Sequence, residues 1–400
     1  MNIKDAILKN NALSKLLKIC DEERFGKVYI VGGFIRDHYF NIRSKDIDLS
    51  VEKNSNILAN RISNIFNAKL ENSMFSTHSI KSNQIKIDVA SMRNESYTRP
   101  GSLPKIKLTN DIRGDLIRRD FTINSLAVCL NTRDIGKIID PLDGLSDINN
   151  KILRNNHSLS FSDDPTRIFR AIKYSNKLGL RIHPDTKNQI YEYKKFIKNL
   201  SSKRILNELN LLLEDDFHTN FKYLSKYNIM SEIEKNLILF TDKISSFNKL
   251  PISKLQKIYL LTKNIDEKVG ESLHNKSPDF FEWSESIKLN HMYKKIQFNK
   301  YISSSEFYLS LKDFPREFLL FMELSEDRKY IKKQISSYLK KTSKIKLYIN
   351  GSDLLKLGFK RGPVIGNILN EILLRKINGE IKTKSDEINF ALKKMKHNLP

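Results

Sequence analysis

Two carboxylates lie two residues apart in the segment Asp46-Ile47-Asp48, which alternates acidic and apolar residues. Side chains two apart in a strand project from the same face, so both carboxylates would point the same way. Two adjacent negative charges are costly unless a cation neutralises them. Mg²⁺ is the natural candidate, because it takes hard oxygen ligands and bridges phosphates. The pair predicts a metal site for phosphoryl chemistry, although an isolated acidic pair is more often a solvated strand feature.

A glycine pair and an arginine precede these acids. Gly32 and Gly33 directly follow an apolar run, and Arg36 comes three residues later in an expected helix. Glycines permit close backbone approach, and the N–H groups at a helix start bind phosphate. The forked guanidinium of Arg36 could hold a triphosphate oxygen. A double glycine alone is more often a tight turn, but its place before the acidic pair favours nucleotide binding.

Two further segments carry charged residues. Asp88 lies in the apolar run 84–92, where a third metal-facing carboxylate and an ordinary polar residue at a strand end are equally supported. Residues 118–124 read Arg-Arg-Asp-Phe-Thr-Ile-Asn. Taken alone, two arginines beside an acid indicate a structural ion pair.

The segment Asp163-Asp164-Pro165-Thr166-Arg167 reads as a helix start, with Asp164 as the N-cap and Pro165 in the first helical position. Asp163, Arg167 and Arg170 fall at i, i+4 and i+7, which predicts that they share one helix face. Asp164 with Arg167 places a hydrogen-bond acceptor next to a donor.

Such a pair suits two of the four bases. Adenine and cytosine present an amine donor beside a bare ring nitrogen, whereas guanine and uracil present a carbonyl beside a ring N–H. A carboxylate accepting from the amine and a guanidinium donating to the ring nitrogen would accept ATP and CTP. Against GTP and UTP the same groups would be left unpaired, which is costly.

The elements that position these residues indicate an α+β protein. Strand signals occur at 27–33, 46–52, 84–92 and 126–130, with a helical stretch at 57–67 between them. Beyond about residue 160 the spacing is helical, as at 164–179 and 205–216. The predicted parts are an N-terminal helix 1–26, a head domain 27–150, a helical neck 151–220, a helical body 221–345 and a helical tail 346–400.

The composition narrows the class of protein. Of 400 residues, 40% are hydrophobic and 10% aromatic, which fits a soluble globular chain. No apolar run reaches the roughly 18 residues of a membrane span. Only Cys20 and Cys129 occur, so we expect neither a disulfide framework nor a zinc cluster, and we expect a reducing cytoplasm. The net charge of +24 favours a polyanionic partner, although abundant Lys, Asn and Ile could also reflect an AT-rich genome.

Several of these segments resemble the motifs of a known protein family. VYIVGGFIRD (28–37) with KDIDLSV (45–51) resembles the first motif of class II tRNA nucleotidyltransferases and bacterial poly(A) polymerases, and RRDFTINS (118–125) resembles the second, with Ser125 where alanine is usual. The resemblance implies a nucleotidyltransferase head with Asp46 and Asp48 as metal ligands. By the same resemblance, the triphosphate would contact Gly32, Gly33 and Arg36, and the ribose and phosphates would contact Arg119, Asp120 and Asn124.

Later segments resemble further motifs of this family. Residues 163–167 are similar to ED-x-x-R, which implies base recognition by Asp164 and Arg167 and an orienting role for Asp163, found where glutamate is frequent. Asp140-Pro-Leu-Asp-Gly144 resembles a head–neck hinge, and 201–209 resembles a neck motif with Lys203 in place of glutamate. Residues 351–381 resemble the C-terminal element. Five basic residues of this element would contact tRNA phosphates or form a solvated face. These residues are Lys356, Lys360, Arg361, Arg375 and Lys376.

The resemblance implies an enzyme that adds or repairs the 3′-terminal CCA of tRNA, with ATP, CTP and Mg²⁺. A poly(A) polymerase would carry an arginine-rich segment of the form GRRFRLVHV, whereas residues 72–92 read NSMFSTHSIKSNQIKIDVASM. A split enzyme that adds only CC or only A stays open, because 93–106 occupies the place of the loop that such enzymes modify. A non-catalytic RNA-binding protein is the remote alternative. The oligomeric state is not predicted.

Overall fold

The computed structural model describes residues 2–44, 46–73, 77–82, 86–239, 252–298 and 302–397. The chain divides into two compact units, Met1–Asn248 and Lys249–Pro400. The predicted neck and the predicted head fall within the first unit. Parts of the predicted body, at 240–251 and 299–301, lie outside the described residues.

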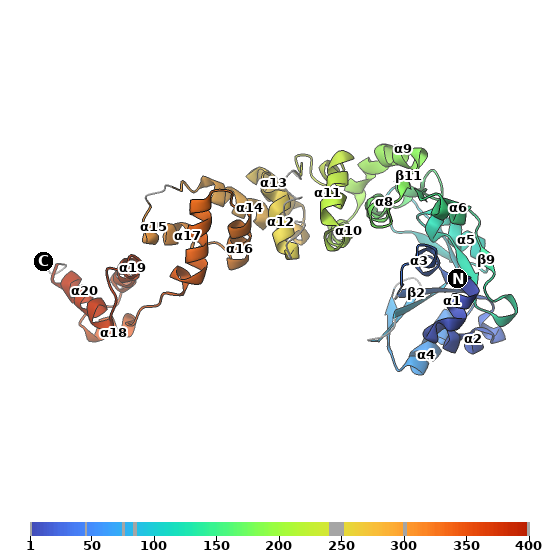
Figure 1. Cartoon of the computed structure of the whole chain (residues 1–400), viewed down its shortest axis with the longest axis horizontal. Coiled ribbons are helices and arrows are strands. Elements are labelled where there is room, and N and C mark those ends of the chain that lie inside the picture. The colour runs from blue at the N-terminus through green and yellow to red at the C-terminus, as the bar shows by residue number, and fades with distance from the viewer. Residues whose placement is uncertain are drawn as a thin grey trace. The chain divides into compact units, whose positions relative to one another are not determined.

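A seven-stranded sheet forms the centre of the first unit (Figure 1). Its strand order is β3-β4-β5-β2-β1-β8-β9. The strands are β1 (Val28–Val31), β2 (Asp46–Val51), β3 (Lys69–Ser73), β4 (Thr77–Lys81), β5 (Lys86–Ser91), β8 (Ala127–Cys129) and β9 (Ile138–Ile139). Two small sheets pair β6 (Arg93–Ser96) with β7 (Lys105–Leu108), and β10 (Ile152–Leu153) with β11 (Arg181–Ile182).

The register of the central strands decides where the acids lie. β2 runs antiparallel to β1 and parallel to β5, and Asp48 lies directly opposite Asp88. All four residues of β1 are buried, as expected for a central strand covered on both sides. The four strands expected from the sequence are thereby confirmed.

Short helices cover the sheet. They are α1 (Ile3–Lys9), α2 (Asn11–Cys20), α3 (Gly33–Tyr39), α4 (Ser55–Phe66) and α5 (Ile112–Ile117). α4 packs on β4 and β5 through Leu58, Ala59 and Ile62, whose spacing gives it an apolar face. α3 contacts β1 and β2, so the glycine turn before it lies beside the acidic strand.

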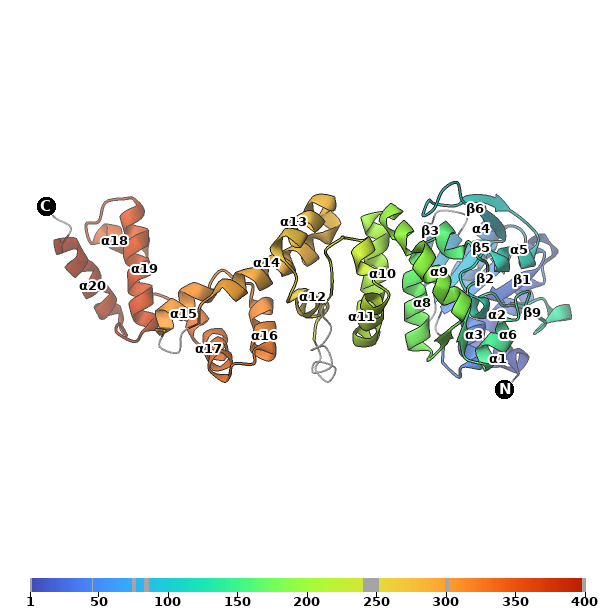
Figure 2. The ribbon, with the colours of Figure 1, turned by 90° about the horizontal axis from the view of Figure 1, so that it is seen from above.

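The rest of the first unit is almost entirely helical. Its helices are α6 (Gly144–Asn149), α7 (Ser160–Asp163), α8 (Thr166–Lys177), α9 (Pro184–Tyr193), α10 (Ser202–Glu214) and α11 (Phe217–Lys226). α8 packs against both α10 and α11 (Figure 2), burying Ile168, Phe169 and Ile172.

One expected helix begins later than predicted. α7 ends at Asp163, Asp164 is extended with φ −133° and ψ 94°, and α8 begins at Thr166 rather than at Pro165. The residue before a proline is disfavoured in the helical region, so the chain breaks at Asp164. The prediction that Asp163, Arg167 and Arg170 share one helix face is therefore wrong.

The second unit is helical wherever it is described. Its helices are α12 (Lys254–Thr262), α13 (Glu267–Lys276), α14 (Phe281–Lys295), α15 (Ser304–Leu311), α16 (Arg316–Ser325), α17 (Lys329–Lys340), α18 (Gly351–Lys356), α19 (Pro363–Ile377) and α20 (Lys384–His397). The predicted α+β class, with strands early and helices late, is confirmed. Among the described residues, no helix has the length and apolar character needed to cross a membrane.

Candidate active site

A polar cavity of about 530 Å³ opens in the first unit between the sheet and the helices α8 and α10. Most of the predicted site residues line it, although they come from distant parts of the chain. The predicted residues in its wall are Gly32, Gly33, Arg36, Asp46, Asp48, Arg119, Asp120, Asn124, Asp164, Arg167 and Arg170. Two predicted residues, Asp88 and Asp163, are not in the wall.

The two predicted metal ligands lie at the start of β2. Asp46 is exposed and Asp48 is half-buried. Burial raises the pKa of Asp48, Arg119 opposes that shift, and the negative charge of Asp88 adds to it. The side chain of Lys86 reaches the same place, with its Nζ 3.3 Å from Oδ2 of Asp46 and 3.9 Å from Oδ2 of Asp88. The carboxylates of Asp46 and Asp48 therefore bring negative charges together, and a bound cation would neutralise them.

Asp46 and Asp48 could hold a divalent cation, for which we propose Mg²⁺. The described residues contain no group of three or more His, Cys, Asp or Glu side chains arranged around one point. Mg²⁺ keeps several waters and is commonly held by one or two carboxylates together with substrate phosphates. Asp46 and Asp48 can supply that pair. Asp88 adjoins them in the sheet, and its part in a metal site stays a prediction.

The glycine turn approaches both the acids and an arginine. Gly32 has φ +71°, and a Cβ placed on it would lie 3.2 Å from Nη1 of Arg119 and 3.8 Å from Oδ2 of Asp48. A side chain here would fill the space between the carboxylate and the guanidinium. Arg36 donates from Nη1 to Oδ1 of Asn124 at 2.7 Å, and from Nη2 to Asp37 at 2.6 Å. The first and second sequence motifs are thus joined through side chains.

The arginines of the second motif are anchored by an acid that sequence analysis did not single out. Asp115 is fully buried and pairs with Nη2 of Arg118 at 2.7 Å and with Nη2 of Arg119 at 3.1 Å. Nε of Arg119 is buried and has no hydrogen-bond partner in the described structure. An incoming ligand could not reach this buried nitrogen. The nitrogen of Arg119 that lies near Gly32 is Nη1, and there a phosphate oxygen would fit.

Asp120 joins the second motif to α8. Its Oδ2 lies 2.5 Å from Nη2 of Arg170, and its Oδ1 accepts from Nδ2 of Asn124 at 3.0 Å. Burial alone would raise the pKa of Asp120, but the Arg170 guanidinium and the Asn124 hydrogen bond hold it below the ordinary value. Asp120 is thus a charged, fixed acceptor at the bottom of the cavity.

Asp164 and Arg167 both face the cavity without pairing with each other. Oδ1 of Asp164 accepts from the backbone N–H of Thr166 at 3.0 Å and from its hydroxyl at 2.6 Å, so it performs the expected capping. Arg167 donates from Nη1 to Oγ of Ser160 at 2.7 Å and from Nη2 to the carbonyl of Arg118 at 2.8 Å. These hydrogen bonds hold both side chains in place in the wall of the cavity.

Asp163 does not orient Arg167 through a direct contact. Among the described residues the two share no hydrogen bond or ion pair, and the ion-pair partner of Asp163 is His157, at 3.9 Å. The helix break at Asp164 separates Asp163 from the face that carries Arg167. Burial raises the pKa of Asp163, and the positive charge of Arg167 opposes this only at longer range.

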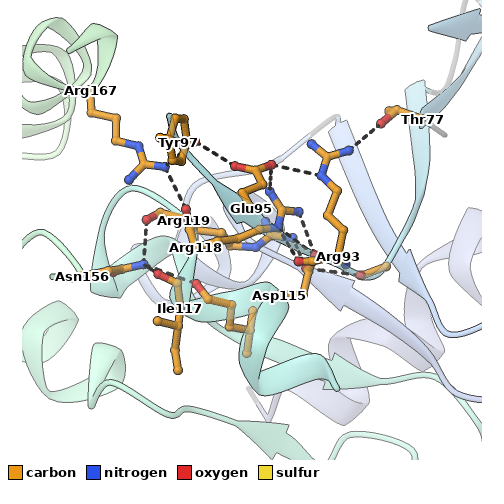
Figure 3. A network of polar contacts seen from close by, with 12 residues as sticks. Thr77, Arg93, Glu95, Tyr97, Asp115, Ile117, Arg118, Arg119, Asn156 and Arg167 are labelled. Carbon is orange, nitrogen blue, oxygen red and sulfur yellow. Dashed lines mark hydrogen bonds and ion pairs between the residues drawn. The ribbon is translucent and has the colours of Figure 1, made fainter. Parts of the chain in front are cut away.

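Further residues of the site were missed by sequence reasoning. Glu95 is a buried carboxylate that pairs with Arg93 at 3.0 Å and with Arg118 at 2.8 Å, and it accepts from the hydroxyl of Tyr97 at 2.9 Å. Tyr97 in turn accepts a long hydrogen bond, 3.5 Å, from Arg167 (Figure 3). The cavity wall also includes Arg118, Tyr174, Arg204 and Glu208. In the sequence, Arg204 and Glu208 were indicated only by their place in segment 201–209, which resembles a neck motif.

The predicted hinge segment 140–144 packs against the second motif. Asp140 accepts from the backbone N–H groups of Gly144 and Leu145 at 2.8 and 3.0 Å. A Cβ on Gly144 would lie 2.2 Å from the carbonyl oxygen of Thr122. Because Thr122 begins the short turn that ends at Asn124, this close contact sets the position of the second motif.

The basic residues of the C-terminal element have different surroundings. Lys376 pairs at 2.6 Å with Glu387, which is fully buried, so it is a structural residue. Arg375 pairs with Glu371 and Glu380. Lys356, Lys360 and Arg361 are exposed. Of the five predicted basic residues, these three are the better candidates for phosphate contact.

Two family models match the chain. The model described as "Poly A polymerase head domain" matches residues 28–154, which hold the sheet, the acidic pair and the second motif. The model described as "Probable RNA and SrmB- binding site of polymerase A" matches residues 179–237, in the helical part of the first unit.

Whole-chain comparisons agree with these matches. An A-adding tRNA nucleotidyltransferase of Geobacter sulfurreducens is 31% identical over 95% of this chain and 46% of its own length. One from Halalkalibacterium halodurans is 28% identical over 93% of this chain and 90% of its own length. This chain therefore spans about half the length of the first relative. The solved complex of a CCA-adding enzyme with CTP has a TM-score of 0.78 at 22% identity, covering 100% of this chain and 99% of that one, and shows the same fold.

Proposed function

Because the chain belongs to the class II tRNA nucleotidyltransferase and bacterial poly(A) polymerase family, we propose that it adds nucleotides, without a nucleic-acid template, to the 3′ end of tRNA. Its substrates are CTP and ATP, its product is the terminal CCA, and pyrophosphate is released. One observation supports this most strongly. The acidic pair, the arginines of the second motif and the Asp164–Arg167 pair line one cavity.

The reaction is an in-line displacement. The oxygen of the terminal 3′-hydroxyl bonds to the α-phosphorus, its proton leaves, and the bond to the bridging oxygen of the β-phosphate breaks. Mg²⁺ held by Asp46 and Asp48 would lower the pKa of the attacking hydroxyl and neutralise charge on the departing pyrophosphate. No side-chain nucleophile is required.

The arginines and the polar residues of the second motif hold the nucleotide. Nη1 of Arg119 lies near Gly32 on the side of Asp48, so it suits the triphosphate. Asp120 and Asn124, hydrogen-bonded to each other and fixed by Arg170 and Arg36, suit the ribose. Fixing these groups in advance reduces the reorganisation needed in the transition state.

Asp164 and Arg167 select the base. The carboxylate accepts from the exocyclic amine of adenine or cytosine, and the guanidinium donates to the neighbouring ring nitrogen. Guanine and uracil would leave both protein groups unpaired, which costs about 1–3 kcal/mol for each group.

A second candidate is addition of the terminal A alone. It is favoured by the names of the two relatives described above, both A-adding enzymes. The test supplies tRNAs that end at the discriminator base, at C or at CC, each with one nucleotide at a time. CCA synthesis predicts C addition to the first two and A addition to the third. Addition to the third alone would support the A-adding candidate, and long runs of A would indicate poly(A) polymerase activity.

A further inference from the structure

Arg204 lies in α10, outside the residues that contact the nucleotide in the proposed function. Its Nη2 donates to Oδ1 of Asp164 at 2.7 Å, and its Nη1 donates to the carbonyl of Gly101 at 2.9 Å. Arg204 therefore connects α10, the break between α7 and α8, and the turn between β6 and β7. A planar fork can hold two acceptors at fixed directions, which a lysine cannot do.

The turn that Arg204 contacts is itself attached to the neck. Gly101 donates its backbone N–H to the carbonyl of Ser162 at 3.1 Å, and Asn199 donates to the carbonyl of Pro100 at 3.1 Å. Gly101 has φ +76°, and a Cβ on it would lie 3.2 Å from Cβ of Asn199. These contacts fix the carbonyl of Gly101, which accepts from Nη1 of Arg204. As a result, Nη2 of Arg204 stays directed toward Asp164.

The two carboxylate oxygens of Asp164 therefore differ in the hydrogen bonds that they accept. Oδ1 accepts three hydrogen bonds, from Arg204 and from the N–H and hydroxyl of Thr166. Within the described structure, Oδ2 accepts none. A carboxylate held in this way offers a single oxygen to a base.

A single available oxygen adds to the discrimination against guanine that the Asp164–Arg167 pair provides. Guanine carries a ring N–H next to its amine, and a carboxylate with both oxygens available can accept from both donors at once. With Oδ1 occupied, the carboxylate can accept from one amine, as adenine and cytosine require. We propose that Arg204 is a positioning residue for base selection, which excludes guanine by keeping one oxygen of Asp164 engaged. This inference rests on the proposed function.

The test measures selectivity, defined as kcat/KM for ATP divided by kcat/KM for GTP, on a tRNA ending in CC. Arg204→Lys keeps the positive charge but loses the planar fork of the guanidinium. Thr166→Val removes the hydroxyl that donates to Oδ1 and keeps the backbone N–H that does the same. We expect selectivity to fall about tenfold or more in Arg204→Lys, with a smaller change in kcat for ATP. It should fall less in Thr166→Val, because Arg204 and the backbone N–H still engage Oδ1. The matched control is Lys203→Gln, which removes a neighbouring exposed cation of the same helix and should leave selectivity unchanged.

The outcomes separate the two proposals. If the wild-type protein adds neither nucleotide, the proposed function fails. If the wild type prefers ATP and Arg204→Lys keeps that preference within twofold, the inference about Arg204 fails alone. Equal losses with ATP and GTP would likewise overturn it, because they indicate a purely structural role. Circular dichroism confirms folding, and equilibrium binding of ATP and GTP to the same variants gives an independent measure of selectivity.

Discussion

Arg170 of α8 and Asp120 of the second motif form an ion pair, with Nη2 2.5 Å from Oδ2 and Nε 2.8 Å from the same oxygen. Asp120 is buried, whereas the side chain of Arg170 is 37% exposed. The pair ties the helix that carries Arg167 to the motif that carries Asn124. It therefore connects the residue proposed to select the base with the residues proposed to bind the ribose and phosphates.

Arg170→Met should destabilise the protein, because Asp120 would be left as a buried carboxylate without its cation. We expect a loss of about 2–4 kcal/mol, measured by urea denaturation followed by circular dichroism. Adding Asp120→Asn should recover part of that loss. The surface pair of Lys177 with Asp215, 3.6 Å apart, serves as a control, and Lys177→Met should cost under about 1 kcal/mol. Equal effects of Arg170→Met and Lys177→Met would contradict this assignment.

Asp115 should make the protein sensitive to acid. Burial favours its neutral form, but Arg119 and Arg118 hold its pKa below the ordinary value. A depressed folded-state pKa contributes stability above the unfolded pKa of about 3.9 and loses it as pH falls through the folded pKa. The decrease in unfolding free energy between pH 6 and pH 3 should therefore be smaller in Asp115→Asn than in the wild type. Asp185→Asn, at an exposed carboxylate, should match the wild type.

Gly144→Ala should disturb the second motif, because the added Cβ would meet the carbonyl of Thr122 at 2.2 Å. Backbone must move to relieve this contact, at a cost of about 1–3 kcal/mol or more. Nucleotide affinity should fall as well, since Asn124 ends the same turn. Gly366→Ala, in the open interior of α19, should instead stabilise the protein by about 0.5–1 kcal/mol. A neutral Gly144→Ala would show that the second motif does not depend on this contact.

Two substitutions in the C-terminal helices should separate folding from RNA affinity. Oε2 of Glu387 accepts from the N–H groups of Tyr348 and Ile349, and Oε1 pairs with Lys376. Glu387→Gln removes the charge and leaves one oxygen for these donors, so it should lower thermal stability. Lys360→Gln should leave stability unchanged and weaken tRNA binding. The salt dependence of tRNA binding is the slope of the logarithm of the binding constant against the logarithm of the salt concentration. This slope should decrease in magnitude by about 0.9 if the variant loses one phosphate contact. An unaltered slope would remove Lys360 from the RNA interface.

Local patterns were sufficient for four strands of the central sheet and for the acidic pair, but they did not indicate the strands β3, β4 and β9 of that sheet. Apolar Ile47 and Leu49 alternate with Asp46 and Asp48, so one strand with both acids on one face follows from period two alone. The pairing of Asp48 with Asp88 does not follow, because register between distant strands is set by tertiary contacts.

The errors and omissions have similar causes. Helical spacing placed Asp163 with Arg167, but Pro165 restricts the preceding residue and ends that helix. Glu95 and Arg204 reach the cavity through contacts with residues 23 to 103 positions away, which no local period reveals. The segments that contain them were noted in the sequence, yet only the fold shows which side chains enter the site.

The most direct test of the account measures pyrophosphate release from ATP with a tRNA ending in CC, over a range of Mg²⁺ concentrations, for the wild type and for Asp48→Asn. We expect release by the wild type to require Mg²⁺. We expect Asp48→Asn to lose about a thousandfold in rate, roughly 4 kcal/mol, with an unfolding midpoint no lower than that of the wild type. Release that continues in excess chelator, or a folded Asp48→Asn variant within tenfold of the wild-type rate, would contradict the account.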